Sequence, residues 1–155
     1  MLFSLEDDRI ESRFATYFAA RLLTQEWLKS SDEIYEIYRA GSDARDAEGN
    51  ELITAYAGRL PNGEWSLLLI SKDPKHVYEA NLIFRKRGIP HDFKGSVDVF
   101  QYSGKQYVLG GSQMQPKPLK ADDPAHFIIQ ASSQRPATVN LPPYSLTVVR
   151  GEIGN

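Results

Sequence analysis

The chain has 155 residues, of which 41% are hydrophobic and 25% are charged, and this is the composition of an ordinary globular protein that can bury a core. Its 18 basic and 20 acidic side chains give a formal net charge of −2, so neither a nucleic-acid-binding surface nor a surface for anionic membranes is expected. The chain has no cysteine, which excludes disulfides, thiolate metal sites, iron–sulfur clusters and cysteine nucleophiles.

At the N-terminus, residues 1–6 reach an acidic side chain without a basic segment and an apolar run, so the sequence predicts no signal peptide. No apolar run approaches the ~18 residues of a membrane span. These features do not indicate in which cellular compartment the protein is found.

The first expected element is one long helix. Asp7 and Asp8 offer acceptors and negative charge where a helix begins, and no Gly or Pro occurs over residues 10–28. The polar residues of this segment are distributed around the helix axis and do not form one solvent-exposed polar face. A helix that is apolar on nearly all sides indicates burial against more than one partner.

After the helix the pattern becomes that of β-strands. Ile34 and the residues that follow it are β-prone, and the clearest signal is a hairpin in which Asn62-Gly63 joins the runs 52–60 and 65–70. Further strands are expected at 77–84, 96–103, 106–109, 127–129 and 144–149, with a proline-rich loop over 110–124.

Strands at hairpin spacing, without helices between them, favour an antiparallel sandwich over βαβ units. We therefore predict an α+β chain that is mostly β, with a long N-terminal helix in residues 1–31 and a β-sandwich domain in residues 32–155.

Three stretches of this sequence have a familiar combination of residues: AARLLTQEW at 19–27, TAY at 54–56 with GEWSLLLISKDP at 63–74, and LPPYSLTVV at 141–149. Together they resemble the C-terminal part of bacterial (β/α)8-barrel glycoside hydrolases, of the broad kind that includes β-xylosidases. In those enzymes the last barrel helix leads into a β-sandwich that closes with a strand similar to Leu-Pro-Pro-Tyr-Ser.

The resemblance implies a non-catalytic accessory domain, or a fragment, that stabilises or covers a catalytic barrel. Glycoside hydrolases of this kind place two carboxylates on the ends of barrel strands. One helix before the strands provides no barrel, so the family's catalytic residues have no positions here and we expect that the chain is not an enzyme. The alternative is a free-standing carbohydrate-binding module. A small self-sufficient glycosidase is a third possibility, but no constellation of residues supports it.

The histidines indicate no metal site, because His76, His91 and His126 are far apart in sequence and lack the short spacing of ligand pairs. Aspartate pairs such as Asp122-Asp123 are typical of caps and turns. No Gly-x-Ser-x-Gly pattern and no phosphate-binding glycine loop occurs, so neither a metal nor another cofactor is expected.

Aromatic residues suggest where a partner could sit. On the strand 96–103, Val97 and Val99 point to one face and Phe100 and Tyr102 to the other, so something must cover a second face. A barrel covers it in the accessory-domain interpretation. In the carbohydrate-binding alternative a glycan stacks on Phe100, Tyr102 and Tyr107.

The helix has more apolar side chains than one sheet face can bury. Its candidate interface residues are Phe14, Phe18, Leu22, Leu23 and Trp27. We expect them to pack against the barrel of a glycoside hydrolase or, through a two-fold axis, against a second copy of this chain in a homodimer.

Overall fold

The computed structural model describes residues 3–6, 9–29, 32–112, 114–132 and 134–154, and antiparallel strands dominate it. Its helical segment is α1 (Ala15–Arg21), continued by the π-helical turn η1 (Leu22–Trp27). The strands in chain order are β1 (Phe3–Glu6), β2 (Arg9–Arg13), β3 (Glu36–Arg39), β4 (Ile53–Arg59), β5 (Trp65–Ser71), β6 (Tyr78–Asn81), β7 (Phe84–Lys86), β8 (Ile89–His91), β9 (Phe93–Tyr102), β10 (Tyr107–Gly111), β11 (Pro116–Ala121), β12 (Ala125–Ala131), β13 (Thr138–Leu141) and β14 (Ser145–Ile153).

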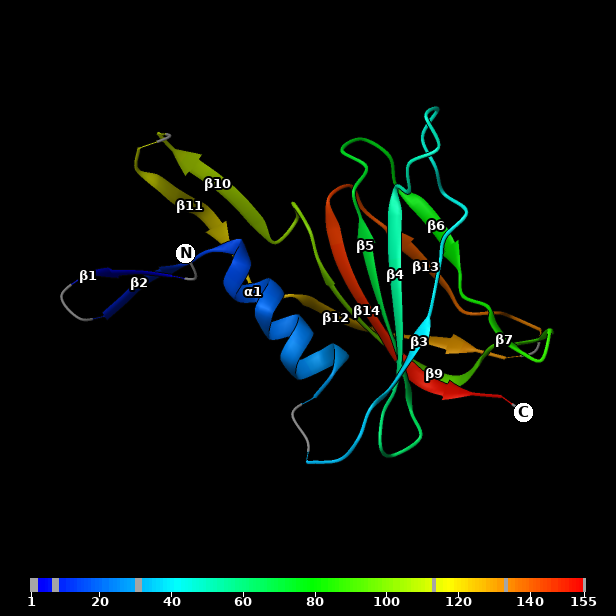
Figure 1. Cartoon of the computed structure of the whole chain (residues 1–155). Helices are drawn as coiled ribbons and strands as arrows, with labels where there is room; N and C mark the ends of the chain where they lie inside the picture. The colour runs from blue at the N-terminus through cyan, green and yellow to red at the C-terminus, as the bar shows by residue number, and fades with distance from the viewer. Residues whose placement is uncertain (1–2, 7–8, 30–31, 113, 133, 155) are drawn as a thin grey trace.

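A six-stranded antiparallel sheet forms the centre of the molecule, with the strand order β12-β9-β14-β5-β4-β3 (Figure 1). Two-residue alternation along each strand gives this sheet two faces. We call one the inner face, which carries Leu67 and Val99, and the other the helix face, which carries Leu68 and Tyr102. The mostly β, antiparallel prediction is confirmed.

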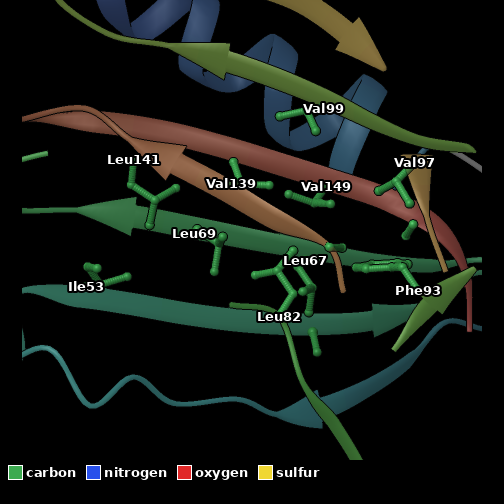
Figure 2. Packing of buried hydrophobic residues seen from close by; sticks show 13 residues of the cluster. Ile53, Leu67, Leu69, Leu82, Phe93, Val97, Val99, Val139, Leu141 and Val149 are labelled. Atoms are coloured by element: carbon green, nitrogen blue, oxygen red, sulfur yellow. The ribbon is translucent and has the colours of Figure 1, made fainter. Parts of the chain in front are cut away.

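The small sheet formed by β6 and β13 covers the inner face. Val139 and Leu141 of β13 pack with Leu67 and Leu69 of β5 in one cluster of buried side chains (Figure 2). Its members are almost all aliphatic, and their fully buried positions reflect the alternation of large apolar residues along β5, β9 and β14. The indole of Trp65 packs at the margin, with its ring centroid 5.3 Å from that of Phe84.

The predicted hairpin is β4–β5, which pairs from Ile53 with Ser71 to Arg59 with Trp65. Gly63 has φ +87°, the left-handed conformation that glycine adopts without a Cβ clash. The Leu60 amide donates to the Glu64 carbonyl at 2.8 Å and closes the turn. The Asn-Gly signal therefore located this element correctly.

The helix lies across the helix face of the sheet (Figure 1). Phe18 and Leu22, each only 1% exposed, reach down to Leu68, Tyr102 and Val148. Leu28, directly after the helical segment, packs closely over Gly58 of β4. A Cβ on Gly58 would lie only 3.1 Å from a methyl carbon of Leu28, so the absence of a side chain there lets the two approach. The helix thus completes a second small core.

The long helix predicted over residues 10–28 is wrong, because the helical segment begins only at Ala15. Residues Arg9–Arg13 form β2, which pairs antiparallel with β1. Phe14 is extended at the helix start, with φ −88° and ψ 164°. Cross-strand pairing has overridden a helix propensity that was never strong for Ile10 and Ser12. The proposed caps Asp7 and Asp8 lie outside the described residues.

The prediction of a loop over residues 110–124 is also wrong, since β10 and β11 form a hairpin there. Pro116 and Pro118 are tolerated because β11 belongs to a two-stranded ribbon and one of its edges needs no donor. Gly111, at φ +81°, lets the chain turn tightly, since a Cβ there would lie 2.3 Å from the Gln115 carbonyl oxygen. Strands β7, β8 and β13 were likewise not predicted as separate elements.

Candidate functional site

A small hollow lies where the end of the helix meets the edge of the helix face. Its volume is about 130 Å³, below the ~300–1,000 Å³ of pockets that enclose drug-sized ligands. The lining residues are Arg21, Leu22, Glu26, Phe100, Asp123, Pro124 and His126. The helix, β9 and the start of β12 therefore supply a mixture of charged and aromatic groups to one place.

The ring of Phe100 lies between two cationic or ionisable side chains. His126 stacks on it with 4.3 Å between ring centroids and an interplanar angle of 3°. The Arg150 guanidinium lies 5.0 Å from the same centroid. His126 comes from β12 and Arg150 from β14, the two strands that flank β9. Phe100 is half-buried and contacts both of these side chains.

Each carboxylate around the hollow has a basic partner. The Arg21 Nη1 atom lies 2.6 Å from Asp123 Oδ1, and His126 Nε2 lies 2.6 Å from Asp98 Oδ1. These side chains are all at least one-third exposed, so each pair contributes about 0–1 kcal/mol. The first pair joins the helix to the loop that precedes β12, and the second joins β12 to β9.

The most buried ion pair at the hollow joins Arg150 to Glu26. Their side chains are 8% and 24% exposed, and Arg150 Nη1 lies 3.3 Å from Glu26 Oε2. The same nitrogen donates to the Glu26 backbone carbonyl at 3.3 Å. Arg150 thereby anchors the π-helical turn to the centre of the sheet, which is a positioning contact and not an acid–base arrangement.

A second polar cluster is centred on Asp73, just after β5. Its carboxylate accepts hydrogen bonds from the Tyr78 hydroxyl at 2.6 Å and from the amides of Lys75 and His76 at 2.6 and 2.9 Å. The two amides donate to Oδ1, and His76 Nδ1 lies 2.9 Å from Oδ2, the oxygen that also accepts from Tyr78. These hydrogen bonds, that from Tyr78 foremost, hold the pKa of Asp73 far below its usual range.

The Asp73 cluster fixes the connection that leads into β6. The backbone carbonyl of Asp73 accepts from the Tyr144 amide at 3.0 Å, so the Lys-Asp-Pro turn and the Pro-Pro-Tyr-Ser turn are joined. Donation to Asp73 raises the pKa of the Tyr78 hydroxyl. This cluster was not predicted, although an Asp-Pro step followed by His and Tyr is a signal for an Asx turn with side-chain partners.

Of the candidate sugar contacts, Phe100 and Tyr102 lie on the helix face, and Tyr107 of β10 packs against the same cluster from outside the six-stranded sheet. Tyr102 is 6% exposed and stacks on Phe18 at 5.1 Å, and burial raises the pKa of its hydroxyl. Tyr107 is half-buried, with its ring centroid 6.3 Å from that of Tyr102. Glycan binding at these residues stays a prediction, which in this arrangement requires the helix to move.

The candidate interface residues of the helix divide into two groups. Phe18 and Leu22 are 1% exposed within the chain itself, so the expectation that they form a free apolar surface is wrong. The sheet offers Tyr102 and Val148 as partners, which the sequence argument did not assign to the helix. Phe14, Leu23 and Trp27 are half-buried, and Trp27 packs at 6.0 Å from Tyr56.

Within the described ranges, no group of three or more histidine and acidic side chains is arranged to hold a metal ion. His91 instead makes a 3.1 Å contact through Nδ1 with the Gly154 carbonyl. No helix in the described part of the chain has the length and apolar character to cross a membrane.

No protein-family model and no curated protein matches this chain. Among solved structures, part of it is similar to a family 44 xyloglucanase from Paenibacillus polymyxa, with 14% identity, a TM-score of 0.43, and coverage of 66% of this chain and 17% of that one. It is also similar to the family 51 α-L-arabinofuranosidase of Thermotoga petrophila, with 13% identity, a TM-score of 0.42, and coverage of 67% and 20%.

A third similar structure is the family 51 arabinofuranosidase from Xanthomonas axonopodis, with 15% identity, a TM-score of 0.39, and coverage of 76% of this chain and 21% of that one. The chain spans about a fifth of the length of these glycoside hydrolases. At these identities and TM-scores the likeness assigns neither a family nor an activity.

Proposed function

We propose that this chain is a non-catalytic accessory β-domain of a glycoside hydrolase, which stabilises a catalytic barrel by packing against it. The observation that carries the proposal is the meeting of the three stretches on which the sequence resemblance rests. Leu22 comes from the first stretch, Leu68 from the second and Val148 from the third, and all three lie in one buried cluster. The stretches therefore form one structural unit.

The exposed apolar side chains of the β10–β11 hairpin also support a docking role. Val108, Leu109 and Leu119 are 42%, 55% and 73% exposed, and the hairpin projects beyond the six-stranded sheet beside the start of the helix (Figure 1). Val108 and Leu109 are consecutive in β10 and point to opposite faces, so both faces of the hairpin expose aliphatic side chains that contact with another domain would cover.

An assay with a panel of aryl α- and β-glycosides tests the proposal. We expect no turnover from the chain alone, since glycoside hydrolysis needs two suitably spaced carboxylates and Glu26, Asp98 and Asp123 are each engaged by a basic partner. Turnover that a single Asp or Glu substitution abolishes would overturn it. The coding sequence adjoining this segment gives a second test, with an in-frame or neighbouring barrel as the expected finding.

A carbohydrate-binding module is the second candidate, and the aromatic cluster of Phe100, Tyr102 and Tyr107 on one face favours it. Affinity electrophoresis in gels containing xylan, arabinan or xyloglucan distinguishes the two. Retardation of the chain that Tyr107→Ala removes, while Tyr38→Ala on the opposite sheet edge retains it, would favour the binding module. Unchanged migration in all gels would favour the accessory domain.

A further inference from the structure

The two edges of the six-stranded sheet have opposite character. At one edge, β3 has only four residues, and charged side chains stand at both of its ends. Glu36 is paired with Arg59 at 3.4 Å, and Arg39 is exposed. A short strand with charged ends is a common protection of an edge against pairing with another chain.

The other edge, β12, has none of these protections. It has seven residues, AHFIIQA, without proline, lysine, arginine or an acidic residue. Within the described residues it pairs only with β9, so every second residue directs its backbone N–H and C=O groups outward. Phe127 and Ile128 are 41% and 58% exposed, one on each face of the sheet. This edge is open to another strand.

The sequence of β12 is close to a palindrome centred on Ile128. An antiparallel partner with the same sequence, placed about a two-fold axis at Ile128, sets Ala125 opposite Ala131, His126 opposite Gln130 and Phe127 opposite Ile129. Small residues face small ones, polar residues face polar ones, and large apolar residues face large apolar ones. No like-charged pair arises, which is the arrangement that stabilises cross-strand neighbours.

We propose that β12 is a self-association edge, at which two copies of this chain pair antiparallel about Ile128 and join their six-stranded sheets into one. A strand from an unrelated partner would gain nothing from the palindrome, whereas a second copy uses every position of it. On the helix face the two Ile128 side chains become direct neighbours, and on the inner face Phe127 of each copy meets Ile129 of the other.

The neighbouring contacts hold β12 ready for pairing. His126 is fixed by its 2.6 Å contact with Asp98 and by its stacking on Phe100. The strand pairs with β9 along its whole length, from Ala125 with Gln101 to Ala131 with Gly95. A pre-ordered strand loses little conformational freedom on association. The inference is independent of the accessory-domain proposal and moves the expected homodimer interface from the helix to β12.

Sedimentation equilibrium over a wide concentration range tests this interface, with Ile128→Lys as the variant and Ile37→Lys as its matched control. Both isoleucines lie on edge strands and on the helix face, with 58% and 57% exposure. We expect the wild-type chain to dimerise, Ile128→Lys to raise the dimer Kd by more than about tenfold because two like charges then face each other, and Ile37→Lys to leave the Kd within about twofold. A wild-type chain that stays monomeric at millimolar concentration overturns the proposal, as does an equal effect of both variants.

A cross-linking experiment gives a readout that does not depend on tolerance of lysine. The chain has no cysteine, so Ile128→Cys introduces a single thiol. Residues directly opposite each other across an antiparallel pair approach closely enough for a disulfide with small adjustments. On mild oxidation we expect a covalent dimer from Ile128→Cys at a rate at least about tenfold above that from Ile37→Cys. Equal rates for the two variants would overturn the two-fold pairing at Ile128.

Discussion

The two faces of the six-stranded sheet carry different kinds of side chain. The inner face packs aliphatic side chains such as Val97, Val99 and Val149, each with no exposed surface, against β13. The helix face combines aromatic rings with a buried arginine, and Tyr102 and Arg150 lie close to Phe18 and Glu26 respectively. One face is a dry core between two sheets, and the other is a mixed surface beneath a short helix.

Buried polar atoms confirm this difference. Atoms without a hydrogen-bond partner in the described part of the chain are Trp27 Nε1, Ser66 Oγ, Ser71 Oγ, Tyr102 Oη and Arg150 Nε. All but Ser71 belong to the helix or to the helix face of the sheet. An unsatisfied buried polar atom costs about 1–3 kcal/mol, so we expect the helix to be bound less strongly than the inner layer. Substitutions on the two faces test that ranking.

The largest effect is expected on the inner face. Phe93 is 1% exposed and packs edge-to-face on Phe84 at 4.9 Å, so Phe93→Ala should lower the free energy of unfolding by about 3–5 kcal/mol. Urea unfolding measured by circular dichroism checks this. Ile83→Ala, the truncation of a large apolar side chain at a 55% exposed position outside β12, is the control and should cost less than about 1 kcal/mol. Similar costs for the two substitutions would contradict the assignment of the core.

On the helix face, Phe18→Ala should cost about 2–3 kcal/mol, less than its complete burial alone predicts. The helix can detach while the inner face stays folded, and the energy of that local opening limits the loss. Hydrogen exchange should therefore show fast exchange in residues 15–27 and retained protection in β5 and β14. Equal acceleration throughout the sheet would show that the two faces unfold together.

Asp73 gives a pH-dependent test on the inner side, where Tyr78 packs against the core. Because folding lowers the pKa of this carboxyl, its contribution to stability is fully present above the pKa of about 4 in the unfolded chain and is lost as the pH falls further. Wild type should lose stability below about pH 4 more steeply than Asp73→Asn, which lacks this titration. Parallel pH profiles in urea melts would argue against the hydrogen-bonded carboxylate.

The ion pairs at the hollow should rank by burial. Glu26→Gln leaves Arg150 buried without its charged partner and should cost about 1–3 kcal/mol. Asp123→Asn removes an exposed pair with Arg21 and should cost less than about 1 kcal/mol. Comparison of the urea midpoints of the two variants at pH 7 measures the difference. A larger effect of Asp123→Asn would invert the ranking.

Local signals explain what could be predicted from the sequence. The β4–β5 hairpin depends on Asn62-Gly63, and the strand at β14 depends on alternation within a few residues. The register of β12 and the short length of the helix depend on partners far along the chain, which no local pattern reveals. The two prolines of β11 concealed a strand, because a missing N–H donor costs a ladder hydrogen bond only where it would face the paired strand, and β11 has one unpaired edge.

For the candidate site, the sequence placed the apolar residues in the correct elements but not in the correct environment. Alternation assigned Phe100 and Tyr102 to one face, and the structure agrees. The covering element, however, is the chain's own helix, which reaches Tyr102 through Phe18. The Asp73 cluster depends on side-chain hydrogen bonds across a turn, and the ion pairs of Arg150 and His126 depend on long-range register, so neither could be derived from spacing alone.

The position of β14 has a consequence for synthesis of the chain. This strand comes last in sequence among those of the six-stranded sheet, yet it lies between β5 and β9 and pairs with both. While the polypeptide is emerging from a ribosome, the hairpin β4–β5 and the pair β9–β12 can each form, but no strand joins them. Two unjoined edges remain available for mispairing until residues 145–153 arrive, so we expect slow, late closure of the sheet and a dependence on chaperones during translation.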